Sequence, residues 1–353
     1  MMTRDATTGI DEPRVSEWYA LHAPGTVPPL TFRMIAGGHS NLTYEVVDGA
    51  GARTVFRRPP LSHALASAHD MGREHRIIAA LQGSAVPVPP VVGMCDDETV
   101  NGAPFYVMRF VDGHVVRDRA AVEHALSESA RGHAWRSLVD TLAALHRIDP
   151  AAVGLADLGR HDGYLERQLK RWYGQWNASK TRELALIDDV HAGLCTRIPT
   201  QHGTSIVHGD YRLDNCMVSS SGDVVAVLDW ELCTLGDPLA DLGVLMTYWT
   251  GPGDDEAAGA LTSTNGRPAT TAPGFADRHD LAVRYAEASG RDVSGIEYYV
   301  SFAHWKLACI LEGVYARYRA GAMGDIEPSM LDTFARHVEG LARRAADALS
   351  RLP

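Results

Sequence analysis

The chain has 353 residues, of which 44 are acidic and 33 are basic, so its formal net charge is −11. Its hydrophobic content of 45% is typical of a globular protein, and its length suggests two domains or one large two-lobed unit. The acidic excess argues against nucleic acid or an anionic membrane as the main partner, because both attract basic surfaces.

The first third of the chain predicts a small sheet with one helix. Alternating apolar residues indicate three strands, over 31–36, 42–47 and 53–58. Residues 48–51 read Asp-Gly-Ala-Gly, which is typical of a hairpin turn between the last two strands. A helix is predicted over 67–81, and an extended stretch over 86–92 leads to a second hairpin whose last strand covers 105–111.

The remainder of the chain is predicted to be mainly helical. Apolar residues at helical spacing indicate helices over 134–148, 164–177, 277–289, 296–319 and 329–349. Short strands are expected over 206–207, 216–218 and 224–228. The stretch 251–274 is rich in Gly, Pro, Thr and Asp, which predicts a loop. We therefore expect a β-rich N-terminal lobe over 1–112, a hinge near Asp112, and a helical C-terminal lobe over 113–353.

The cysteines and the hydropathy pattern indicate the surroundings of the protein. The five cysteines are scattered and never spaced as C-x-x-C, so we expect reduced thiols rather than disulfides or a zinc site. No apolar run approaches the roughly 18 residues of a membrane span. The polar N-terminus shows no secretory pattern, and a cytoplasmic protein without a membrane partner is expected.

The most informative segment is a loop motif at 207–215, which reads VHGDYRLDN and is followed by VLDWE at 227–231. Protein kinases carry H-R-D-x-x-x-x-N in their catalytic loop and D-F-G further along the chain. The same spacing occurs here, with Gly209 in place of the arginine and Asp-Trp-Glu in place of D-F-G. A lone HGD could simply be a loop whose aspartate caps a helix, but the combined spacing favours a catalytic site.

Phosphoryl transfer explains why these residue types recur. A carboxylate beside the attacking hydroxyl can orient it and take its proton, and Asp210 suits this catalytic role. Mg²⁺ is a hard cation that prefers oxygen ligands, which the amide oxygen of Asn215 and the carboxylate of Asp229 can supply. Asp229 follows an apolar strand, so we expect it to be held rigidly.

Together with further segments, these motifs resemble the aminoglycoside phosphotransferase family, which is also described as choline-kinase-like. The similarity covers about 31–319 and includes GGHSNLTY at 37–44, FRRPP at 56–60, HDMGRE at 69–74 and GDPLADLG at 236–243. Within the family, the sequence is most similar to the kinase module ahead of acyl-CoA dehydrogenase domains in some animal mitochondrial proteins, and to its free-standing bacterial relatives.

The resemblance implies a fold and a set of cofactors. It implies an α+β, two-lobed, protein-kinase-like fold, with a small antiparallel β N-terminal lobe carrying one helix and a large, mainly helical C-terminal lobe. Residues 1–112 would bind the nucleotide, and 113–353 would carry the catalytic and substrate-binding residues. ATP and Mg²⁺ are the implied cofactors, and a small-molecule hydroxyl is the implied acceptor.

The resemblance also assigns nucleotide-binding residues. The phosphate-covering loop would consist of Gly37, Gly38, His39, Ser40 and Asn41. A Gly-Gly segment between strands is more often only a turn, and the chain contains no Walker-type G-x-x-x-x-G-K-[ST] motif. The backbone of a hinge that includes Arg109 and Val111 would meet the base, although an ordinary linker is the simpler reading of those residues.

Lysine is scarce in this chain, and its scarcity bears on the phosphate site. The three lysines are Lys170, Lys180 and Lys306, so none lies in the N-terminal lobe, where kinases pair a strand lysine with a helix glutamate. The position falls on Arg57, with Glu74 as its expected partner. Arginine can hold a phosphate with two donors, but the pair could also be an exposed surface ion pair.

Several supporting residues have weaker assignments. His208, Asp237 and Asp241 are interpreted as structural residues that brace the catalytic loop. Asp214 could be a third acid near the metal or could face solvent. The aromatic and basic stretch 167–176 could help to bind an acyl or CoA group, but a packed amphipathic helix is the favoured reading.

The identity of the acceptor stays open at this level. The resemblance favours a hydroxyacyl-CoA-type substrate and a functional link to acyl-CoA metabolism, although this chain contains no dehydrogenase domain. An aminoglycoside or another antibiotic is the alternative, because polycations could be drawn to a protein of charge −11 and to the acids at 254–256. A nucleotide-binding pseudokinase, or a regulatory partner of an acyl-CoA dehydrogenase, is disfavoured by the intact Asp210, Asn215 and Asp229. A protein kinase is disfavoured by Gly209 and by the lack of an A-P-E segment.

Overall fold

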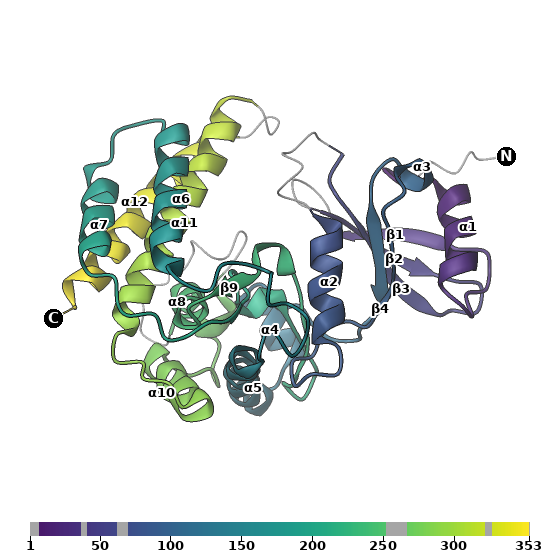
Figure 1. Ribbon diagram of the computed structural model, residues 1–353, viewed down its shortest axis with the longest axis horizontal. Helices are drawn as coiled ribbons and strands as arrows, with labels where there is room; N and C mark the ends of the chain where they lie inside the picture. The colour runs from purple at the N-terminus through teal and green to yellow at the C-terminus, as the bar shows by residue number, and fades with distance from the viewer. Residues whose placement is uncertain (1–6, 37–40, 62–69, 252–266, 322–326, 353) are drawn as a thin grey trace. The chain divides into compact units, whose positions relative to one another are not determined.

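The computed structural model describes residues 7–36, 41–61, 70–251, 267–321 and 327–352 (Figure 1). The chain divides into two compact units. Unit 1 consists of Met1–Asp112 and Ala226–Glu231, and unit 2 consists of Gly113–Val225 and Leu232–Pro353. None of the described helices is long and apolar enough to cross a membrane.

Unit 1 is built on a five-stranded antiparallel sheet in the order β1-β2-β3-β5-β4. The strands are β1 (Thr31–Ala36), β2 (Leu42–Val47), β3 (Arg53–Arg58), β4 (Val91–Cys95) and β5 (Phe105–Arg109). The first three have the predicted bounds. β5 ends two residues before the predicted 111, because its ladder with β3 closes at the Thr54–Arg109 pair.

Helices cover both faces of this sheet, with α1 (Glu12–His22) on one side and α2 (Met71–Leu81) on the other (Figure 1). Trp18 of α1 meets Phe105 edge to face at 5.0 Å, and Phe105 in turn stacks on Phe56 at 4.5 Å. These rings are central to a buried apolar cluster that holds α1 against the sheet. A short helix, α3 (Glu98–Asn101), contacts α1.

The start of α2 is set by an N-cap. The side chain of Asp70 accepts a hydrogen bond from the Arg73 N–H, so the helix begins at Met71 rather than at 67 as predicted. Residues 67–69 of the predicted helix, and 62–66 before it, lie outside the described part of the chain. The cap places Glu74 in the first turn, where its side chain is buried against the sheet.

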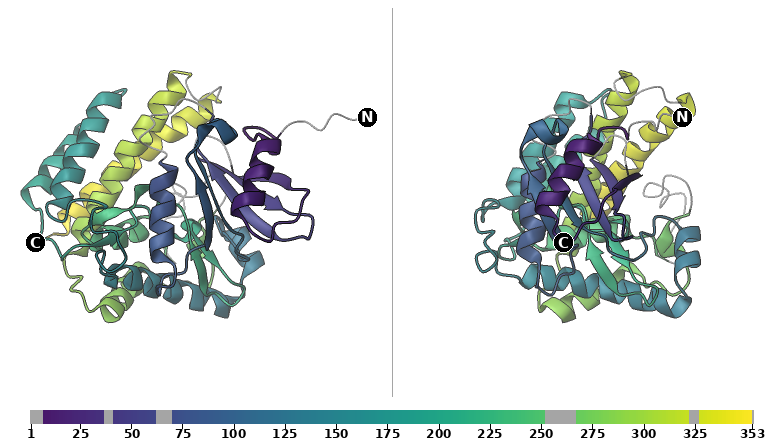
Figure 2. Two further views of the ribbon diagram at one scale, coloured as in Figure 1. Left: turned by 45° about the vertical axis from the view of Figure 1, so that its right-hand side comes forward. Right: turned by 90° about the vertical axis from the view of Figure 1, so that its right-hand side faces the viewer.

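Unit 2 is mainly helical. Its helices are α4 (Arg119–Ala125), α5 (Glu128–Arg147), α6 (Tyr164–Ser179), α7 (Ala185–Thr196), α8 (Leu239–Tyr248), α10 (Arg278–Ser289), α11 (Ile296–Arg319) and α12 (Pro328–Ser350). α11 and α12 lie side by side in all views (Figure 2), and α11 also contacts α6, α7 and α8. The sequence predicted α11 with its observed bounds, whereas α4, α7 and α8 were not predicted.

Short strands in the chain lead into and out of the loops that carry the motifs. β6 (Ser205–Val207) pairs antiparallel with β9 (Thr234–Gly236), while β7 (Cys216–Val218) and β8 (Val224–Val227) are separated by a turn with Gly222 at φ +96°. In the described part of the predicted loop 251–274, residues Ala269–Thr271 form a 3₁₀ turn. The α+β plan predicted from the sequence, a small antiparallel sheet with a mainly helical C-terminal part, is confirmed.

Candidate active site

The loop after β6 carries the HGD motif, and its backbone requires the glycine. Gly209 has φ +87°, and a Cβ at this position would lie 2.7 Å from the carbonyl oxygen of Leu232. A side chain is therefore excluded by both the left-handed conformation and the space. The glycine that replaces the arginine of protein kinases is thus dictated by local geometry.

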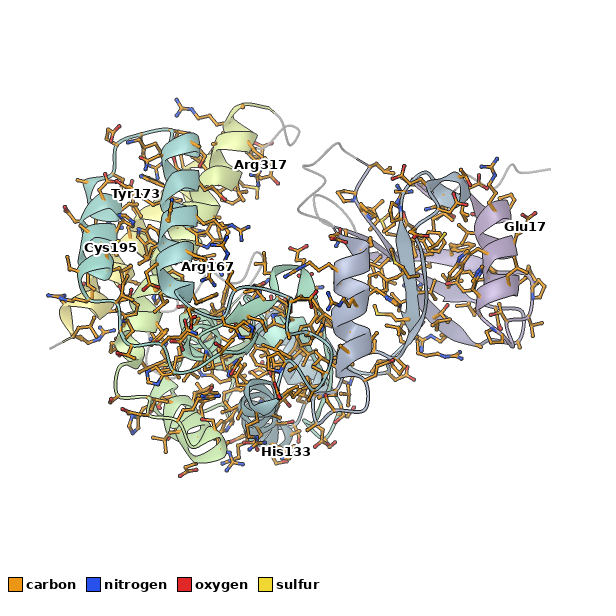
Figure 3. All side chains as sticks on the ribbon, in the orientation of Figure 1. Glu17, His133, Arg167, Tyr173, Cys195 and Arg317 are labelled. Carbon is orange, nitrogen blue, oxygen red and sulfur yellow. The ribbon has the colours of Figure 1, made fainter. Side chains whose placement is uncertain are left out.

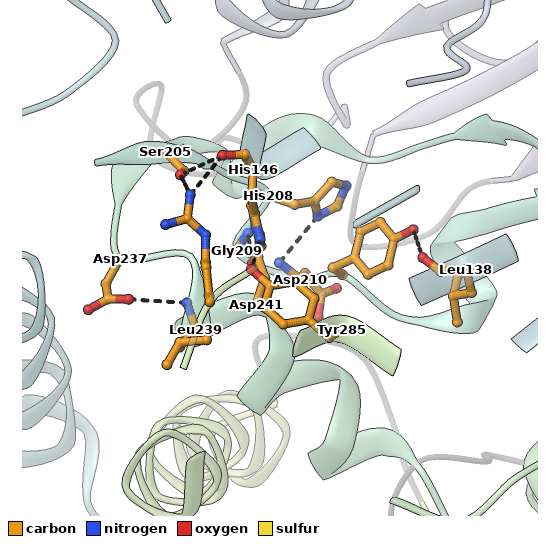
Figure 4. Close-up of polar contacts among 12 residues, drawn as sticks. Leu138, His146, Ser205, His208, Gly209, Asp210, Asp237, Leu239, Asp241 and Tyr285 are labelled. Carbon is orange, nitrogen blue, oxygen red and sulfur yellow. Dashed lines mark hydrogen bonds and ion pairs between the residues drawn. The ribbon is translucent and has the colours of Figure 1, made fainter. Parts of the chain in front are cut away.

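A buried carboxylate on α8 holds this loop in place (Figure 4). Asp241 accepts hydrogen bonds from the backbone N–H groups of His208 at 2.6 Å and Gly209 at 2.7 Å. The ring of His146 contacts the same carboxylate at 3.2 Å, and its other nitrogen lies 2.7 Å from the Tyr285 hydroxyl. Burial alone would raise the pKa of Asp241, but the His146 contact, the charge of His208 and the Gly209 N–H hold it below its usual value.

A second buried aspartate fixes the beginning of α8. Asp237 accepts from the Tyr299 hydroxyl at 2.8 Å and from the backbone N–H groups of His202 and Leu239, both at 3.1 Å. The Asp237–Leu239 contact is drawn in Figure 4. The interpretation of Asp241 as a residue that braces the catalytic loop is therefore confirmed, whereas the contacts of Asp237 fix the start of α8 and the segment before β6 instead.

The two motif residues at either end of the loop lie together. The Nδ2 group of Asn215 donates to both the backbone carbonyl and the Oδ2 atom of Asp210, each at 2.9 Å. Since Nδ2 is committed to Asp210, the amide oxygen Oδ1 is the atom that Asn215 can offer to a cation. The Asp210 side chain is about one quarter exposed, at 24%, so it stays accessible to a substrate.

One cation of this loop was not predicted from the sequence. Arg212 lies between two carboxylates, with Nε 3.3 Å from Asp210 and a terminal nitrogen 3.0 Å from Asp214. Its guanidinium also lies over the ring of Tyr248, at 4.6 Å from the centroid. Burial raises the pKa of Asp214 despite the charge of Arg212, which argues against the solvent-facing alternative for this residue. The only sequence signal was a basic residue two positions after Asp210.

In unit 1, Arg57 of β3 binds two carboxylates at once. Its Nε is 3.1 Å from Glu74 and a terminal nitrogen is 2.8 Å from Asp229. The side chains of Arg57 and Glu74 are only 15% and 2% exposed, so the alternative of a surface ion pair is wrong. Burial alone would lower the pKa of Arg57, but the charges of Glu74 and Asp229 raise it above its usual value. The guanidinium is therefore permanently charged.

Asp229 sits in a strained backbone conformation. Its φ of +66° is the only positive φ of a non-glycine residue among the described residues. Left-handed backbone costs a residue with a Cβ about 1–2 kcal/mol, and such strain concentrates at functional positions. This conformation occurs two residues after the end of β8 and sets the direction of the carboxylate that Arg57 contacts.

Of the five residues predicted to form the phosphate loop, the structure describes Asn41. Gly37, Gly38, His39 and Ser40 lie outside the described residues. Asn41 is 2% exposed, and neither its Nδ2 nor its Oδ1 has a hydrogen-bond partner among the described residues. A buried amide without partners is costly, so this side chain is suited to a polar ligand such as a phosphate group.

Arg109 and Val111 are the remaining residues that the sequence analysis assigned to the nucleotide. Arg109 ends β5, and its backbone N–H donates to the Pro90 carbonyl at 2.7 Å. Val111 lies in the segment that follows β5. The roles of Arg109 and Val111 at the nucleotide base stay predictions.

The aromatic and basic stretch 167–176 is a packed helix. Trp172 and Trp176 of α6 are buried, and Arg167 donates to the carbonyls of Asp162 and Arg160. Tyr173 stacks on a ring of α7, that of His191, with centroids 3.8 Å apart. Figure 3 shows Arg167 and Tyr173 on α6 beside Cys195 on α7. The favoured structural reading of this stretch is confirmed.

Comparisons with known proteins identify the family of this chain. The model of the phosphotransferase enzyme family matches residues 31–277. Acyl-CoA dehydrogenase family member 11 of Gallus gallus is 31% identical over 325 residues, which is 92% of this chain and 41% of that protein. This chain spans less than half the length of the curated relatives it matches.

Solved structures confirm the predicted kinase-like fold. One from Ralstonia eutropha JMP134, described provisionally as an aminoglycoside phosphotransferase, is 32% identical with a TM-score of 0.78, covering 96% of this chain and 98% of that one. An amicoumacin kinase in complex with AMP-PNP, Ca²⁺ and Ami is 16% identical with a TM-score of 0.58, covering 95% of this chain and 94% of that one. At that identity the second likeness shows the fold alone.

Proposed function

We propose that this chain, which belongs to the phosphotransferase enzyme family, transfers the γ-phosphate of ATP to a hydroxyl group of a small molecule. The observation that carries the proposal is the catalytic loop, in which Asp210 is oriented by Asn215 while Asp241 holds the backbone of His208 and Gly209. This arrangement keeps one partly exposed carboxylate in a fixed position, as proton acceptance from a hydroxyl requires.

In this proposal Asp210 acts as the catalytic base. It accepts a hydrogen bond from the acceptor hydroxyl and takes its proton as the new P–O bond forms, while ADP leaves with the electron pair of the broken bond. Asn215 keeps the carboxylate oriented, and Arg212 beside it adds positive charge where the phosphoryl group gains negative charge. Residues 113–353 would thus carry the catalytic and substrate-binding groups.

The nucleotide is assigned to the lobe over 1–112. Arg57 supplies a buried, permanently charged guanidinium, and Asn41 supplies an amide that has no partner in the described part of the chain. The loop residues Gly37, Gly38, His39 and Ser40, and the hinge residues Arg109 and Val111, complete the proposed site. Support for ATP comes from fold neighbours of the phosphotransferase type that were solved with AMP-PNP.

Mg²⁺, when bound with the nucleotide, would neutralise phosphate charge and orient the transferred group. The donors proposed for it are the Oδ1 atom of Asn215 and the carboxylate of Asp229, both of the oxygen type that Mg²⁺ prefers. Among the residues that the structure describes, no three His, Cys, Asp or Glu side chains are grouped to hold a metal. The proposed metal therefore depends on phosphate oxygens for its remaining ligands.

The acceptor we favour is a hydroxyacyl-CoA-type compound. Support comes from the curated relatives, which carry the name of acyl-CoA dehydrogenases and share this module. An aminoglycoside or another antibiotic is the alternative, supported by the description of the Ralstonia eutropha structure. A nucleotide-binding pseudokinase is disfavoured, because Asp210, Asn215 and Asp229 are all present.

The test is a phosphoryl-transfer assay followed by mass spectrometry, with ATP and Mg²⁺ and a panel of hydroxyacyl-CoAs and kanamycin-type compounds. Asp210→Ala is expected to lower transfer at least about a hundredfold while AMP-PNP binding is retained. Asp347→Ala, which removes an exposed carboxylate of α12, is the matched control. Full turnover by Asp210→Ala would overturn the catalytic assignment, and phosphorylation of kanamycin-type compounds alone would refute the acyl acceptor.

A further inference from the structure

The three lysines of this chain differ in their surroundings, and only Lys306 is buried. It lies in the middle of α11 at 7% exposure, whereas Lys170 is exposed and Lys180 is partly exposed. An ammonium group removed from water is costly unless a counter-charge or several hydrogen bonds replace its hydration. The partners of Lys306 therefore decide what this residue does.

Its surroundings satisfy the ammonium group only in part. Nζ donates to the backbone carbonyl of Gly209 at 3.0 Å and lies 5.5 Å from the centroid of the Trp172 ring. In the described part of the chain, no carboxylate lies within ion-pair distance of it. An ammonium has three N–H donors, so two of them have no acceptor among the described residues.

The charges around Lys306 come from three elements. Burial is the largest influence and lowers the pKa of Lys306, the charge of Arg171 on α6 lowers it further, and the charges of Asp210 and Asp241 raise it. The nearest anionic groups thus belong to the catalytic loop and to its brace on α8. The catalytic loop contains the Gly209 carbonyl that Lys306 contacts.

A pocket beside the catalytic loop is lined by both Asp210 and Lys306. Most of the remaining wall is apolar and comes from Leu232, Val244, Ala303, Leu307 and Ile310. Among the described residues that line this pocket, Asp210 is the only acidic one. In that part of the pocket wall, a polycationic acceptor would meet a buried positive charge and no carboxylate besides the catalytic one.

We propose that Lys306 is a specificity-determining residue, whose ammonium donates to a carbonyl or carboxylate oxygen of the acceptor while Asp210 receives its hydroxyl. The apolar wall of this pocket, whose volume is about 30 Å³, contacts the carbon atoms next to the reacting hydroxyl. This inference rests on the proposed phosphoryl transfer and adds the charge that the acceptor must carry. It places neutral or anionic acyl compounds in the pocket and excludes compounds that present an amine to Lys306.

A purely structural role would have a different signature. If Lys306 only held the Gly209 carbonyl, its removal would disturb the catalytic loop and lower turnover of every acceptor by the same factor. If it reads the acceptor, its removal would change the ratio of kcat/KM between acyl and amine acceptors, mainly through KM. The ratio therefore distinguishes the two roles even when overall activity falls.

The experiment compares three matched series with ATP and Mg²⁺: hydroxyhexanoyl-CoA positional isomers, the matching free hydroxyhexanoates and the matching aminohexanols. The wild-type chain is expected to prefer acyl compounds over aminohexanols. Lys306→Met should reduce this preference by between about tenfold and a hundredfold, the value of a hydrogen bond from a charged donor. Lys170→Met, which removes an exposed lysine, should leave it unchanged. Comparison of the CoA thioesters with the free acids shows whether a thioester carbonyl or a carboxylate supplies the oxygen that Lys306 contacts.

A conservative variant covers the case in which Lys306→Met does not fold. Lys306→Arg keeps the charge and the donors, and it should retain the preference for acyl compounds. A wild-type chain that prefers aminohexanols, or variants that lower all acceptors equally, would overturn the role of Lys306. Transfer to no compound of these series, and to none of the kanamycin-type compounds either, would overturn the proposed function itself, whereas transfer with an unchanged preference would overturn only this inference.

Discussion

Gly209 and Gly290 are two left-handed glycines of unit 2 that differ in the space around them. Both have positive φ, +87° and +71° respectively. A Cβ on Gly209 would meet the Leu232 carbonyl oxygen at 2.7 Å, whereas a Cβ on Gly290, at the end of α10, would meet nothing within 4 Å. A side chain would therefore strain the backbone at both positions, but of the two it would clash with a neighbouring atom only at Gly209, in the catalytic loop.

This contrast predicts the effect of two alanine substitutions. Gly290→Ala should lower the free energy of unfolding by about 1 kcal/mol, the cost of left-handed backbone. Gly209→Ala should lower it by about 2–4 kcal/mol, because the clash with Leu232 adds to that cost. It should also impair transfer, because the loop that holds Asp210 must shift. Urea unfolding of both variants and a transfer assay provide the measurements, and equal destabilisation by the two would contradict the prediction.

At the residue scale, the sequence could predict what local spacing encodes. Asp210 and Asn215 are five positions apart in one loop, so a spacing motif finds both of them, and the structure joins them by hydrogen bonds. Lys306 contacts the same loop from 97 positions further along the chain. No pattern within a single sequence encodes a pairing of that length, so the lysine beside the catalytic loop could only be found in three dimensions.

At the scale of elements, α8 connects the unit 2 core to the catalytic loop. Every residue from Leu239 to Thr247 is buried, so this helix has no polar face. A helix that is buried on all sides and mostly apolar gives no 3.6-residue alternation, which is why periodicity did not predict it. β1, β2 and β3 were predicted with their observed bounds because turn residues and alternating side chains mark their ends.

Asp241 is the residue through which α8 acts on the loop, and Asp241→Asn tests this. The amide oxygen of an asparagine can accept a hydrogen bond from one of the two backbone N–H groups. Its NH₂ group would face the other N–H, and two donors cannot form a hydrogen bond with each other. Since removal of one partner from a buried charged network leaves the rest unpaired, we expect a loss of about 3 kcal/mol in the free energy of unfolding. Asp347→Asn on the exposed side of α12 is the control and should change stability little.

The loss in the free energy of unfolding caused by Asp241→Asn is expected to depend on pH. The pKa of Asp241 is lowered in the folded chain, so the carboxylate adds stability above its unfolded pKa of about 3.9. That contribution is lost as the pH falls through the folded pKa. Asp241→Asn should therefore destabilise most at neutral pH and converge toward the wild type in acid. Urea unfolding between neutral and acidic pH would reveal this, and a constant difference at all pH values would contradict it.

At the scale of the whole molecule, the proposed nucleotide groups and the catalytic base are in different compact units. Arg57, Glu74 and Asp229 belong to unit 1, whereas Asp210 and Asn215 belong to unit 2. The segment Ala226–Glu231, which is remote in sequence from the rest of unit 1, brings Asp229 to Arg57. A motif can indicate both carboxylates, but it cannot show that Asp229 and an arginine 172 positions away form one ion pair.

This division predicts where a nucleotide should stabilise the molecule. AMP-PNP with Mg²⁺, at a hundredfold excess over its dissociation constant, should raise the free energy of unfolding by about 2.7 kcal/mol through mass action. Hydrogen exchange should place the added protection in β1, β2, β3, α2 and residues 226–231. Arg57→Met should reduce the stabilisation at the same nucleotide concentration, because it removes the buried cation proposed to bind the phosphates.

The control for Arg57→Met is Arg14→Met on α1, which removes an exposed arginine of the same unit. It should leave the stabilisation by AMP-PNP unchanged, because an exposed cation outside the proposed site gives no differential binding. Calorimetry of the four combinations of variant and nucleotide separates lost binding from lost stability, since the nucleotide-free chains give the reference. Equal stabilisation of Arg57→Met and the wild type, or added protection confined to unit 2, would place the nucleotide elsewhere and remove Arg57 from the proposed phosphate site.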